Sequence, residues 1–455
     1  MPPAHDQPLG PQLGRNVPLF VAFRILFNAR FYYPVFMVMF LDFGISVEEF
    51  GILNAVWAAA IVLLEVPSGA LADLVGRRRL LVAGAGLMVS EMLVLCLVPV
   101  PSPWVLPALL ANRILSGVAE AFISGADEAL AFDSLQAVGR AGEWPRVLER
   151  LMQWGGLVTV AAMITGSLVY DPGSLNAAAT ACGLPGGLTQ ADTFRLPIWL
   201  TLGFAIAAVG VALKMREPPR DRAAAPAAAT RQGLAGLAVP FRHTLATGRW
   251  ILTQPLVLVV IAAGVLLDQP IRQVLVVSSE IYRQIGVPER FFGFVSAGSA
   301  VLGLLTATPM RRLALGRSPR FNVAVLAAVT FVGLAGTVAL IPVWSLAFYM
   351  LLSVALRLVV FLQSYYLNQL VDSAQRATVL SFRGLAVNVG YGLMSLGFAA
   401  AVAGIDRSSS GGPAPGLAAE SFRTVLGWLP WYFLIVAVVF TVWARRLVGR
   451  VARRG

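Results

Sequence analysis

The sequence predicts an all-α polytopic membrane protein with twelve transmembrane helices in two pseudo-symmetric six-helix halves. Three observations predict this class. The 455 residues are 58% hydrophobic and only 13% charged, with a mean hydropathy of +0.76, whereas soluble domains have about 45–50% apolar and about 25% charged residues. Apolar stretches long enough to cross a bilayer recur along the chain. Basic residues gather in every second connection between these stretches.

The apolar stretches define the predicted helices in order, because about 20 apolar residues are needed to span the hydrocarbon core. Several contain Pro, which membrane helices tolerate when neighbouring helices satisfy the freed backbone groups. The predicted spans are residues 17–42, 48–72, 80–100, 104–134, 147–170, 194–215, 251–282, 289–310, 320–341, 343–371, 378–404 and 422–446.

Loop charge predicts the orientation, because arginine and lysine are enriched in short cytoplasmic loops. One alternating set of connections is poor in arginine. The other set is rich in it and contains Arg77 to Arg79, Arg140 to Arg150, Lys214 to Arg249, Arg311 to Arg320, Arg376 and Arg445 to Arg454. We therefore expect both termini in the cytoplasm and the chain in the inner membrane.

The longest basic connection divides the spans six and six. It holds a low-complexity alanine-rich run from Arg222, which is typical of a flexible linker. Asp133-Ser-Leu-Gln and Asp372-Ser-Ala-Gln stand in corresponding places of the two halves, as expected for a repeated unit. The predicted organisation is a tail at 1–16, a bundle at 17–215, a loop at 216–250, a bundle at 251–447 and a basic tail at 448–455.

Composition and motifs exclude several function classes. The net charge of +12 is spread over short loops and forms no soluble basic face, so we expect no nucleic-acid partner. Two Cys and two His are too few and too scattered for a metal site, and we expect no metal, no cofactor and no catalytic residues. No Gly-rich loop ends in Gly-Lys-Ser/Thr, so the predicted energy source is an ion gradient, of protons.

One loop between the second and third spans carries a recognisable motif, Gly69-Ala-Leu-Ala-Asp73-Leu-Val-Gly76-Arg77-Arg78-Arg79. It resembles the loop 2–3 signature of the major facilitator superfamily. The resemblance implies a cytoplasmic latch made by Asp73, Arg77 and Arg78, with Gly69 and Gly76 allowing close backbone approach. Leu74 replaces a residue that is often basic in the family. The alternative is that the arginines only set orientation.

A second stretch, Arg113-Ile-Leu-Ser-Gly117, resembles the fourth-helix pattern that the family associates with proton coupling. The chain resembles the bacterial branch of drug and metabolite efflux permeases. It lacks the Gly-Pro pair of drug antiporters in the fifth span, Gly155 to Gly166.

Charged residues within the fourth span are expensive in a bilayer, at about 2.5–3.5 kcal/mol or more each at a helix centre, so their default interpretation is functional. Arg113, Glu120 and Asp127 are seven residues apart and would lie on one face of a continuous helix. We expect Arg113 to pair with Glu120. Glu120 and Asp127 are the leading candidates to carry a proton, and the alternative is a static ion-pair ladder.

The first and seventh spans carry further charges at mid-depth, and the resemblance implies that both border a central cavity. We expect Arg30 and Asp268 to pair or to share the substrate, and a fixed structural pair is the alternative. Asp268 is also a candidate for proton coupling, whereas the role of Glu91 stays open. The predicted substrate-cavity residues are Arg24, Asn28, Arg30, Tyr33, Asp268, Gln269, Arg272, Arg357, Gln363 and Asn388.

The leading functional hypothesis is a monomeric secondary transporter that moves a small organic molecule by alternating access, by proton-coupled efflux. The second hypothesis is proton-coupled uptake or facilitated diffusion of a polar or anionic metabolite. A third, from another class, is a membrane receptor or scaffold that transports nothing. The expected partners are a small-molecule substrate and the lipid bilayer, and an enzyme is not expected.

Overall fold

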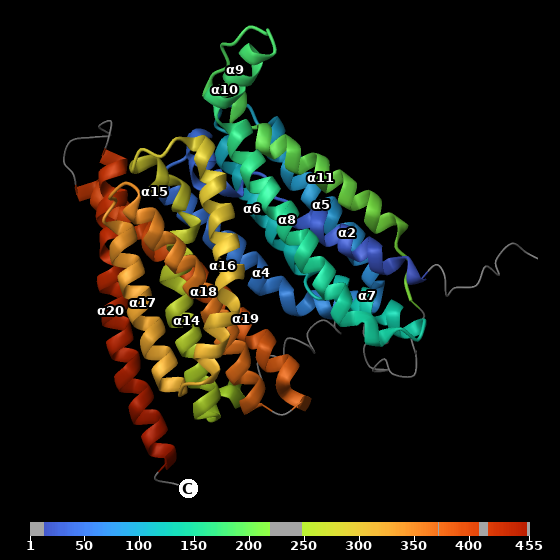
Figure 1. The fold of residues 1–455 in the computed structure, drawn as a ribbon, viewed down its shortest axis with the longest axis vertical. Helices are drawn as coiled ribbons and strands as arrows, with labels where there is room; N and C mark the ends of the chain where they lie inside the picture. Colours follow the sequence, from blue (N-terminus) through green and yellow to red (C-terminus); the bar gives the residue numbers. More distant parts are fainter. Residues whose placement is uncertain (1–12, 219–247, 372, 409–416, 453–455) are drawn as a thin grey trace, which may run out of the picture. The chain divides into compact units, whose positions relative to one another are not determined.

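The computed structural model describes residues 13–218, 248–371, 373–408 and 417–452. Within helices, a few side chains, including that of Asp73, lie outside the described set. The described secondary structure is helical, and Figure 1 shows the helices in sequence colours. Most of the predicted central loop and of the predicted N-terminal tail falls outside these ranges, whereas residues 448–452 of the predicted C-terminal tail belong to the last helix.

Eleven helical segments of the described residues are long and apolar enough to cross a membrane. The predicted eighth span corresponds to α16, a 24-residue helix that includes several residues outside the described set. The all-α multi-pass fold is therefore confirmed. The long helices are α4 (Val47–Val75), α5 (Arg77–Leu97), α6 (Val105–Ile123), α8 (Trp144–Tyr170), α11 (Leu196–Lys214), α14 (Pro255–Val276), α16 (Phe292–Leu315), α17 (Pro319–Val338), α18 (Trp344–Leu370), α19 (Ser373–Ser408) and α20 (Leu417–Ala452).

Two predicted spans are broken in the structure, which corrects their prediction as single helices. The first span consists of α2 (Asn16–Asn28), the 3₁₀ turn η1 (Tyr33–Val35) and α3 (Phe36–Asp42). Pro34 lies at this break, where its missing N–H and rigid ring oppose a continuous helix. The break places Arg30 in irregular backbone between two helices.

The fourth span ends as α6 at Ile123 and resumes as α7 (Ala126–Ala137). Gly125 between them has φ +76°, a left-handed conformation that glycine adopts without a steric penalty. Asp127 therefore lies on a different helix from Arg113 and Glu120. The predicted single-face stripe on one continuous helix is wrong for this reason.

Short helices fill several connections. After α14, whose membrane-spanning stretch ends at Val276, the chain continues as α15 (Ser278–Gln284). The connection from α8 to α11 contains α9 (Pro172–Ala181) and α10 (Gln190–Thr193), both labelled in Figure 1. Asp171 caps α9, since its carboxylate accepts the Ser174 N–H at 2.7 Å, and such a cap satisfies one free donor of the first turn. The 3₁₀ turns η2 (Ala141–Glu143) and η4 (Glu289–Phe291) precede α8 and α16.

Compactness divides the chain into two units. Unit 1 comprises Met1–Tyr33, Ala60–Gly166 and Arg195–Arg242, and unit 2 comprises Pro34–Ala59, Ser167–Phe194 and His243–Gly455. Unit 2 thus joins two segments of the predicted N-terminal half, 34–59 and 167–194, to the predicted C-terminal half. The division into two six-helix halves stays a prediction.

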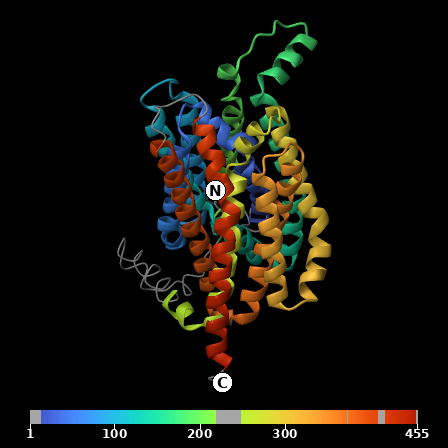
Figure 2. The same cartoon turned by 90° about the vertical axis from the view of Figure 1, so that its left-hand side faces the viewer.

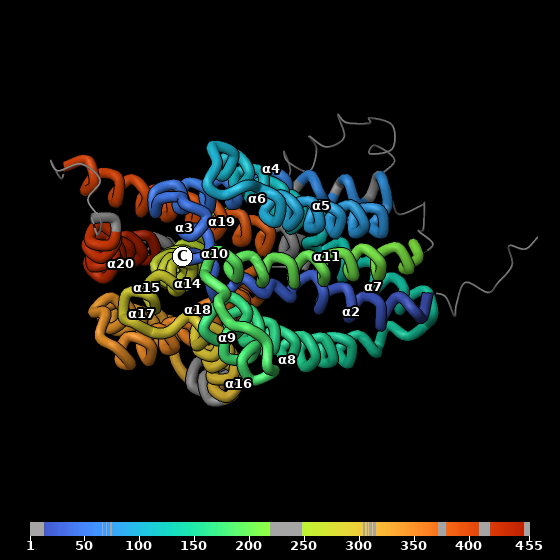
Figure 3. Tube along the Cα trace, turned by 90° about the horizontal axis from the view of Figure 1, so that it is seen from above, coloured from blue at the N-terminus to red at the C-terminus, as the bar shows by residue number. Residues whose placement is uncertain are grey.

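Unit 1 packs around α5, which contacts α6 and α11, while α2 contacts α11 and α7 (Figure 3). Its largest apolar cluster includes Phe23, Leu81, Met88, Ile123 and Ala208, all buried. In a bilayer such side chains hold helices together by van der Waals packing rather than by removal from water. This packing holds the polar side chains of α2, α5 and α6 at fixed positions within the unit.

Unit 2 packs around α14, which lies beside α17, α18, α19 and α20. An apolar cluster at one end includes Ile251, Ile261, Leu367 and Val379. The long helix α20 runs to near the C-terminus (Figure 2), and its sequence includes Arg445 and Arg446 near that end. The sequence predicts that this end of the helix is cytoplasmic, because it carries Arg445 and Arg446.

Candidate functional site

The irregular segment after α2 places a buried arginine against a buried glutamate of α5. Arg30 Nη1 donates to the Glu91 carboxylate, and the two side chains are 4% and 0% exposed. The ring of Phe27 lies 5.1 Å from Arg30 Cζ. Asn112 of α6 donates to the Glu91 backbone carbonyl at 3.0 Å. This pair ties α2, α5 and α6 together at membrane depth.

A second ion pair lies between α2 and α7. Arg24 Nε is 3.0 Å from Asp127 Oδ2, and Arg24 Nη2 is 3.2 Å from Glu128 Oε1. Asp127 is fully buried, whereas Glu128 is exposed. Asn28 donates its side-chain amide to the Arg24 carbonyl at 2.9 Å. The break at Gly125 thus turns Asp127 toward an arginine of another helix.

Glu120 differs from these two carboxylates. It lies half-buried on α6, and in the described part of the chain it has neither an ion pair nor a hydrogen bond through its side chain. Arg30 and Arg24 are the cations that act on Glu120 electrostatically. Arg113, the predicted partner of Glu120, instead donates from Nε and Nη2 to Asn112 Oδ1 at 3.0 and 2.8 Å.

The loop between α4 and α5 is built on Gly76, whose φ of +105° is left-handed. Arg77 Nη1 donates to Asp133 of α7, and the backbone N–H groups of Arg77 and Arg78 donate to the two oxygens of Glu217 at 3.0 and 2.8 Å. Anions favour such a helix N-terminus, where backbone donors are free. Arg77 and Arg78 therefore make polar contacts with Asp133 and Glu217 within unit 1, and their role as a latch stays a prediction.

For two residues of the predicted latch, Asp73 and Gly69, the structure describes no latch contact. The side chain of Asp73 lies outside the described residues, so its role stays a prediction. A Cβ added at Gly69 would meet no described atom within 4 Å, which corrects the expected close backbone approach there. At Gly76 the same Cβ would lie 3.3 Å from Glu217 Oε2.

In unit 2, α14 carries an ion pair within its own helix. Arg272 Nε and Nη2 donate to the two oxygens of Asp268 at 2.6 and 2.8 Å. Gln269 Nε2 donates to the Val387 carbonyl of α19 at 3.1 Å. Asp268 thus pairs with Arg272 within unit 2, and Arg30 pairs with Glu91 within unit 1. The expectation that Arg30 and Asp268 pair or share the substrate stays a prediction.

The remaining predicted cavity residues are dispersed. Gln363 is buried on α18 and donates to the Ile261 carbonyl at 3.3 Å. Arg357 is exposed and packs over Gly303, and Asn388 is half-buried on α19. Tyr33 of unit 1 is 48% exposed, and its ring is 5.3 Å from that of Tyr32.

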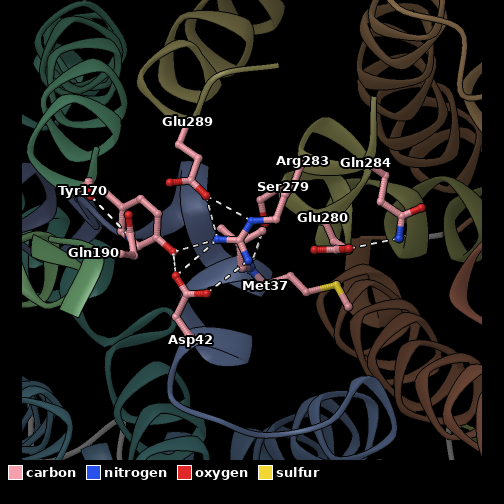
Figure 4. A network of polar contacts seen from close by, with 10 residues as sticks. Met37, Asp42, Tyr170, Gln190, Ser279, Glu280, Arg283, Gln284 and Glu289 are labelled. Carbon is pink, nitrogen blue, oxygen red and sulfur yellow. Dashed lines mark hydrogen bonds and ion pairs between the residues drawn. The ribbon is translucent and has the colours of Figure 1, made fainter. Parts of the chain in front are cut away.

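A further polar network within unit 2 connects α3, α8, α15 and η4 (Figure 4). Arg283 of α15 donates to Asp42 at 3.1 and 3.2 Å and to Glu289 at 2.7 and 3.0 Å. Tyr170 donates its hydroxyl to Asp42. Burial lowers the pKa of Arg283, but its bonds with Asp42 and the nearby acidic groups raise it overall. Arg283 therefore stays charged and holds the predicted outer ends of three spans.

Ser279 reinforces this network. Its Oγ accepts the backbone N–H groups of Met37 and Val38 at 3.0 and 3.2 Å. These donors belong to the first turn of α3, where no carbonyl of the same helix is in place to receive them. The segment 34–42 is thereby fixed to α15.

Glu280, beside this network, is buried with one oxygen unbonded. Its Oε1 accepts from Gln284 at 3.0 Å, and its Oε2 has no hydrogen-bond partner within the described ranges. Burial raises the pKa of Glu280, against the lowering effect of Gln284 and Arg283. A raised folded-state pKa means that the stability contributed by the neutral form is lost as pH rises through that pKa.

We expect Glu280→Gln to stabilise the protein above that pKa by about 1 kcal/mol, because the amide removes a desolvated charge. Below the unfolded-state pKa the carboxyl is neutral in both states, so the difference should vanish. Melting temperatures of the two proteins at pH 4 and pH 8 test this. An equal difference at both pH values would contradict it, and Glu149→Gln, an exposed change, is the control.

Several residues of these networks were not singled out by the sequence. Glu217, Asp42 and Tyr170 stand next to span ends, where charges and tyrosines are ordinary. Glu91 was visible as a carboxylate at membrane depth, but its partner was not. The available signal was that the predicted first span carries Arg24 and Arg30 at depth without an acid nearby in sequence, which required a carboxylate on another helix.

The fold and these polar groups define a class: a multi-pass membrane protein of the transporter type, with ion pairs inside its spans. The family model of the major facilitator superfamily matches residues 19–395. The chain belongs to the major facilitator superfamily. No curated protein sequence matches it significantly.

Solved structures of transporters share the fold. A mutant of the nucleoside transporter NupG has a TM-score of 0.69 at 11% identity, over 94% of this chain and 99% of its own. A bacterial homolog of the human lysosomal transporter Spinster, inward-facing and unoccupied, has 0.68 at 14%, over 97% and 98%. A POT family transporter in complex with 5-aminolevulinic acid has 0.59 at 14%, over 98% of each. At these identities the likeness is one of fold.

Proposed function

We propose that this protein is a proton-coupled secondary transporter of a small organic molecule that works by alternating access, with Glu120 as the proton carrier. The observation that carries the proposal is the contrast among the buried acids of unit 1. Glu91 and Asp127 are each held by an arginine, whereas Glu120 has no such partner among the described residues. Because the chain belongs to a family of transporters, we expect it to transport a molecule and not to catalyse a reaction.

The physical argument concerns charge. The arginines beside Glu91 and Asp127 fix these two carboxylates in ion pairs. A half-buried carboxylate without that bond can exchange its proton more easily. Arg30 and Arg24 act electrostatically on Glu120, so its protonation changes the balance of the two neighbouring ion pairs. This coupling supports a role for Glu120 in converting a proton gradient into movement.

We expect Glu120→Gln to abolish substrate accumulation driven by a pH gradient in proteoliposomes, down to the level of empty liposomes. Exchange of substrate without a gradient should persist, because the amide mimics the protonated carboxyl. A thermal-shift screen of metabolites and antimicrobials on purified protein supplies the substrate. Gradient-driven accumulation at the wild-type rate would contradict the role of Glu120, and Glu143→Gln in an exposed turn is the matched control.

For direction we propose export. Uptake or facilitated diffusion of a polar or anionic metabolite is the alternative, and whole cells separate them. If the protein exports, a protonophore raises the amount of compound retained by expressing cells. If it imports, a protonophore lowers that amount. A receptor or scaffold would move none of the screened compounds under any gradient.

A further inference from the structure

The spans of unit 2 around α14 contain more cations than anions. Over Pro255–Val276, Trp344–Leu370 and Val379–Ala403 the charged residues are Arg272, Arg357, Arg383 and a single acid, Asp268. Each charge at membrane depth costs at least about 2.5–3.5 kcal/mol near a helix centre unless it is paired or hydrated. The excess positive charge therefore requires a physical reason.

Two of these arginines have Asp268 as a charged neighbour, and Arg272 bonds to it. Asp268 is 3% exposed and accepts both donors of Arg272, which is 34% exposed. Arg383 lies on α19 and has Asp268 and Arg272 as its charged neighbours. Within the described residues Arg383 makes no ion pair with Asp268, whose carboxylate accepts both donors of Arg272.

The contact between α14 and α19 fixes where Arg383 lies. Gln269, next to Asp268 in sequence, donates to the Val387 carbonyl at 3.1 Å. It also packs against Gly390, where a Cβ would come within 2.9 Å of the Gln269 side chain. Arg383 is four residues before Val387, one helical turn along the same face. Its guanidinium therefore belongs to the α14 side of α19.

Arg383 is half-buried, and its Nε is buried without a hydrogen-bond partner in the ranges that the structure describes. A buried donor left unsatisfied costs roughly 1–3 kcal/mol, and more when charged. An arginine fork matches the two oxygens of a carboxylate or phosphate. An oxyanion would therefore satisfy this group where Asp268 does not.

We propose that Arg383 and Arg272 form a subsite for the anionic group of the transported molecule, a small organic carboxylate or phosphate ester. This rests on the proposed transport function and narrows its substrate class. The oxyanion would bridge the two guanidinium groups, and Asp268 would supply the counter-charge to Arg272 when the subsite is empty. Neutral analogues would lack this attraction.

The test uses purified full-length protein and matched pairs of probes: succinate with succinamide, benzoate with benzamide, and glycerol 3-phosphate with glycerol. At least one anion is expected to raise the melting temperature while its neutral partner does not. Arg383→Gln should weaken binding of that anion and so raise its half-saturating concentration by roughly tenfold or more. Arg383→Lys should recover part of the affinity because it restores the charge.

Arg140→Gln, in an exposed turn, is the matched control and should bind as wild type does. Without ligand, Arg383→Gln should melt at or above the wild-type temperature, because it removes an unpaired charge. A lower melting temperature would show a structural role and overturn the proposal. Equal shifts of the melting temperature by the anions and by their neutral partners would also overturn it. So would a finding that phosphatidylglycerol is the one anion that binds at Arg383. If the protein binds and transports neutral probes but no anion, the anion subsite is refuted. Proton-coupled transport would still stand in that case.

Discussion

Glu91→Ala is expected to lower the free energy of unfolding by about 3–5 kcal/mol, because it leaves Arg30 as an unpaired buried charge. Both side chains are nearly inaccessible, at 4% and 0% exposed. The Phe27 ring near Arg30 Cζ cannot replace a carboxylate. Unfolding in mixed micelles, followed by tryptophan fluorescence, measures the loss.

A paired replacement separates the missing partner from the missing volume. The double variant Arg30→Met with Glu91→Leu should recover most of the stability, since an apolar pair of similar size often matches a buried ion pair. A double variant as unstable as the single one would refute the ion-pair explanation. Glu143→Ala breaks a surface pair with Arg140 and should leave unfolding unchanged.

Arg283→Gln is expected to cost about 1–3 kcal/mol and to loosen the predicted outer ends of the spans. The change removes the cation shared by Asp42 and Glu289 and leaves the two acids facing each other. Partial exposure of all three side chains keeps the cost below that of the Arg30 pair. Burial raises the pKa of Glu289, so the loss should be smaller at acid pH, where that carboxyl is neutral.

Labelling measures the loosening directly. Ser278→Cys places a thiol at a site that is 9% exposed, in a Cys182→Ser background because Cys182 is exposed and Cys96 is buried. A membrane-impermeant maleimide should label it faster when Arg283 is replaced. Unchanged labelling would contradict the expectation that Arg283 holds the predicted outer ends of the spans together. Arg407→Gln breaks only the exposed 3.7 Å contact with Glu48 and is the control.

The site was predictable only in part, and Asp127 shows why. Its burial and its place in a membrane span follow from the apolar residues around it. Its partner, Arg24, is 103 positions away and depends on how α2 packs on α7. Glycine at 125 permits many conformations, so the sequence could not specify that the helix breaks there and turns Asp127 away from Glu120.

The deep charges of α2 and α14 make the same point. Each could be recognised as costly in a bilayer, and each therefore needed a partner. Arg30 could have paired with Asp268 or Glu91 by charge alone, and packing decided for Glu91. Asp268 took Arg272, a residue four positions away on its own helix, because that geometry needs no second helix.

By itself, the sequence determined the class of fold, because hydrophobic length and loop charge act locally: a stretch of about 20 apolar residues must cross the bilayer whatever its neighbours are. The motif from Gly69 to Arg79 determined the family resemblance in the same local way. Only the tertiary structure decided which buried charges pair, where spans break, and that Arg283 gathers Asp42, Tyr170 and Glu289. Those features depend on contacts between residues far apart in the chain, and a one-residue change in helix rotation redirects a side chain by about 100°.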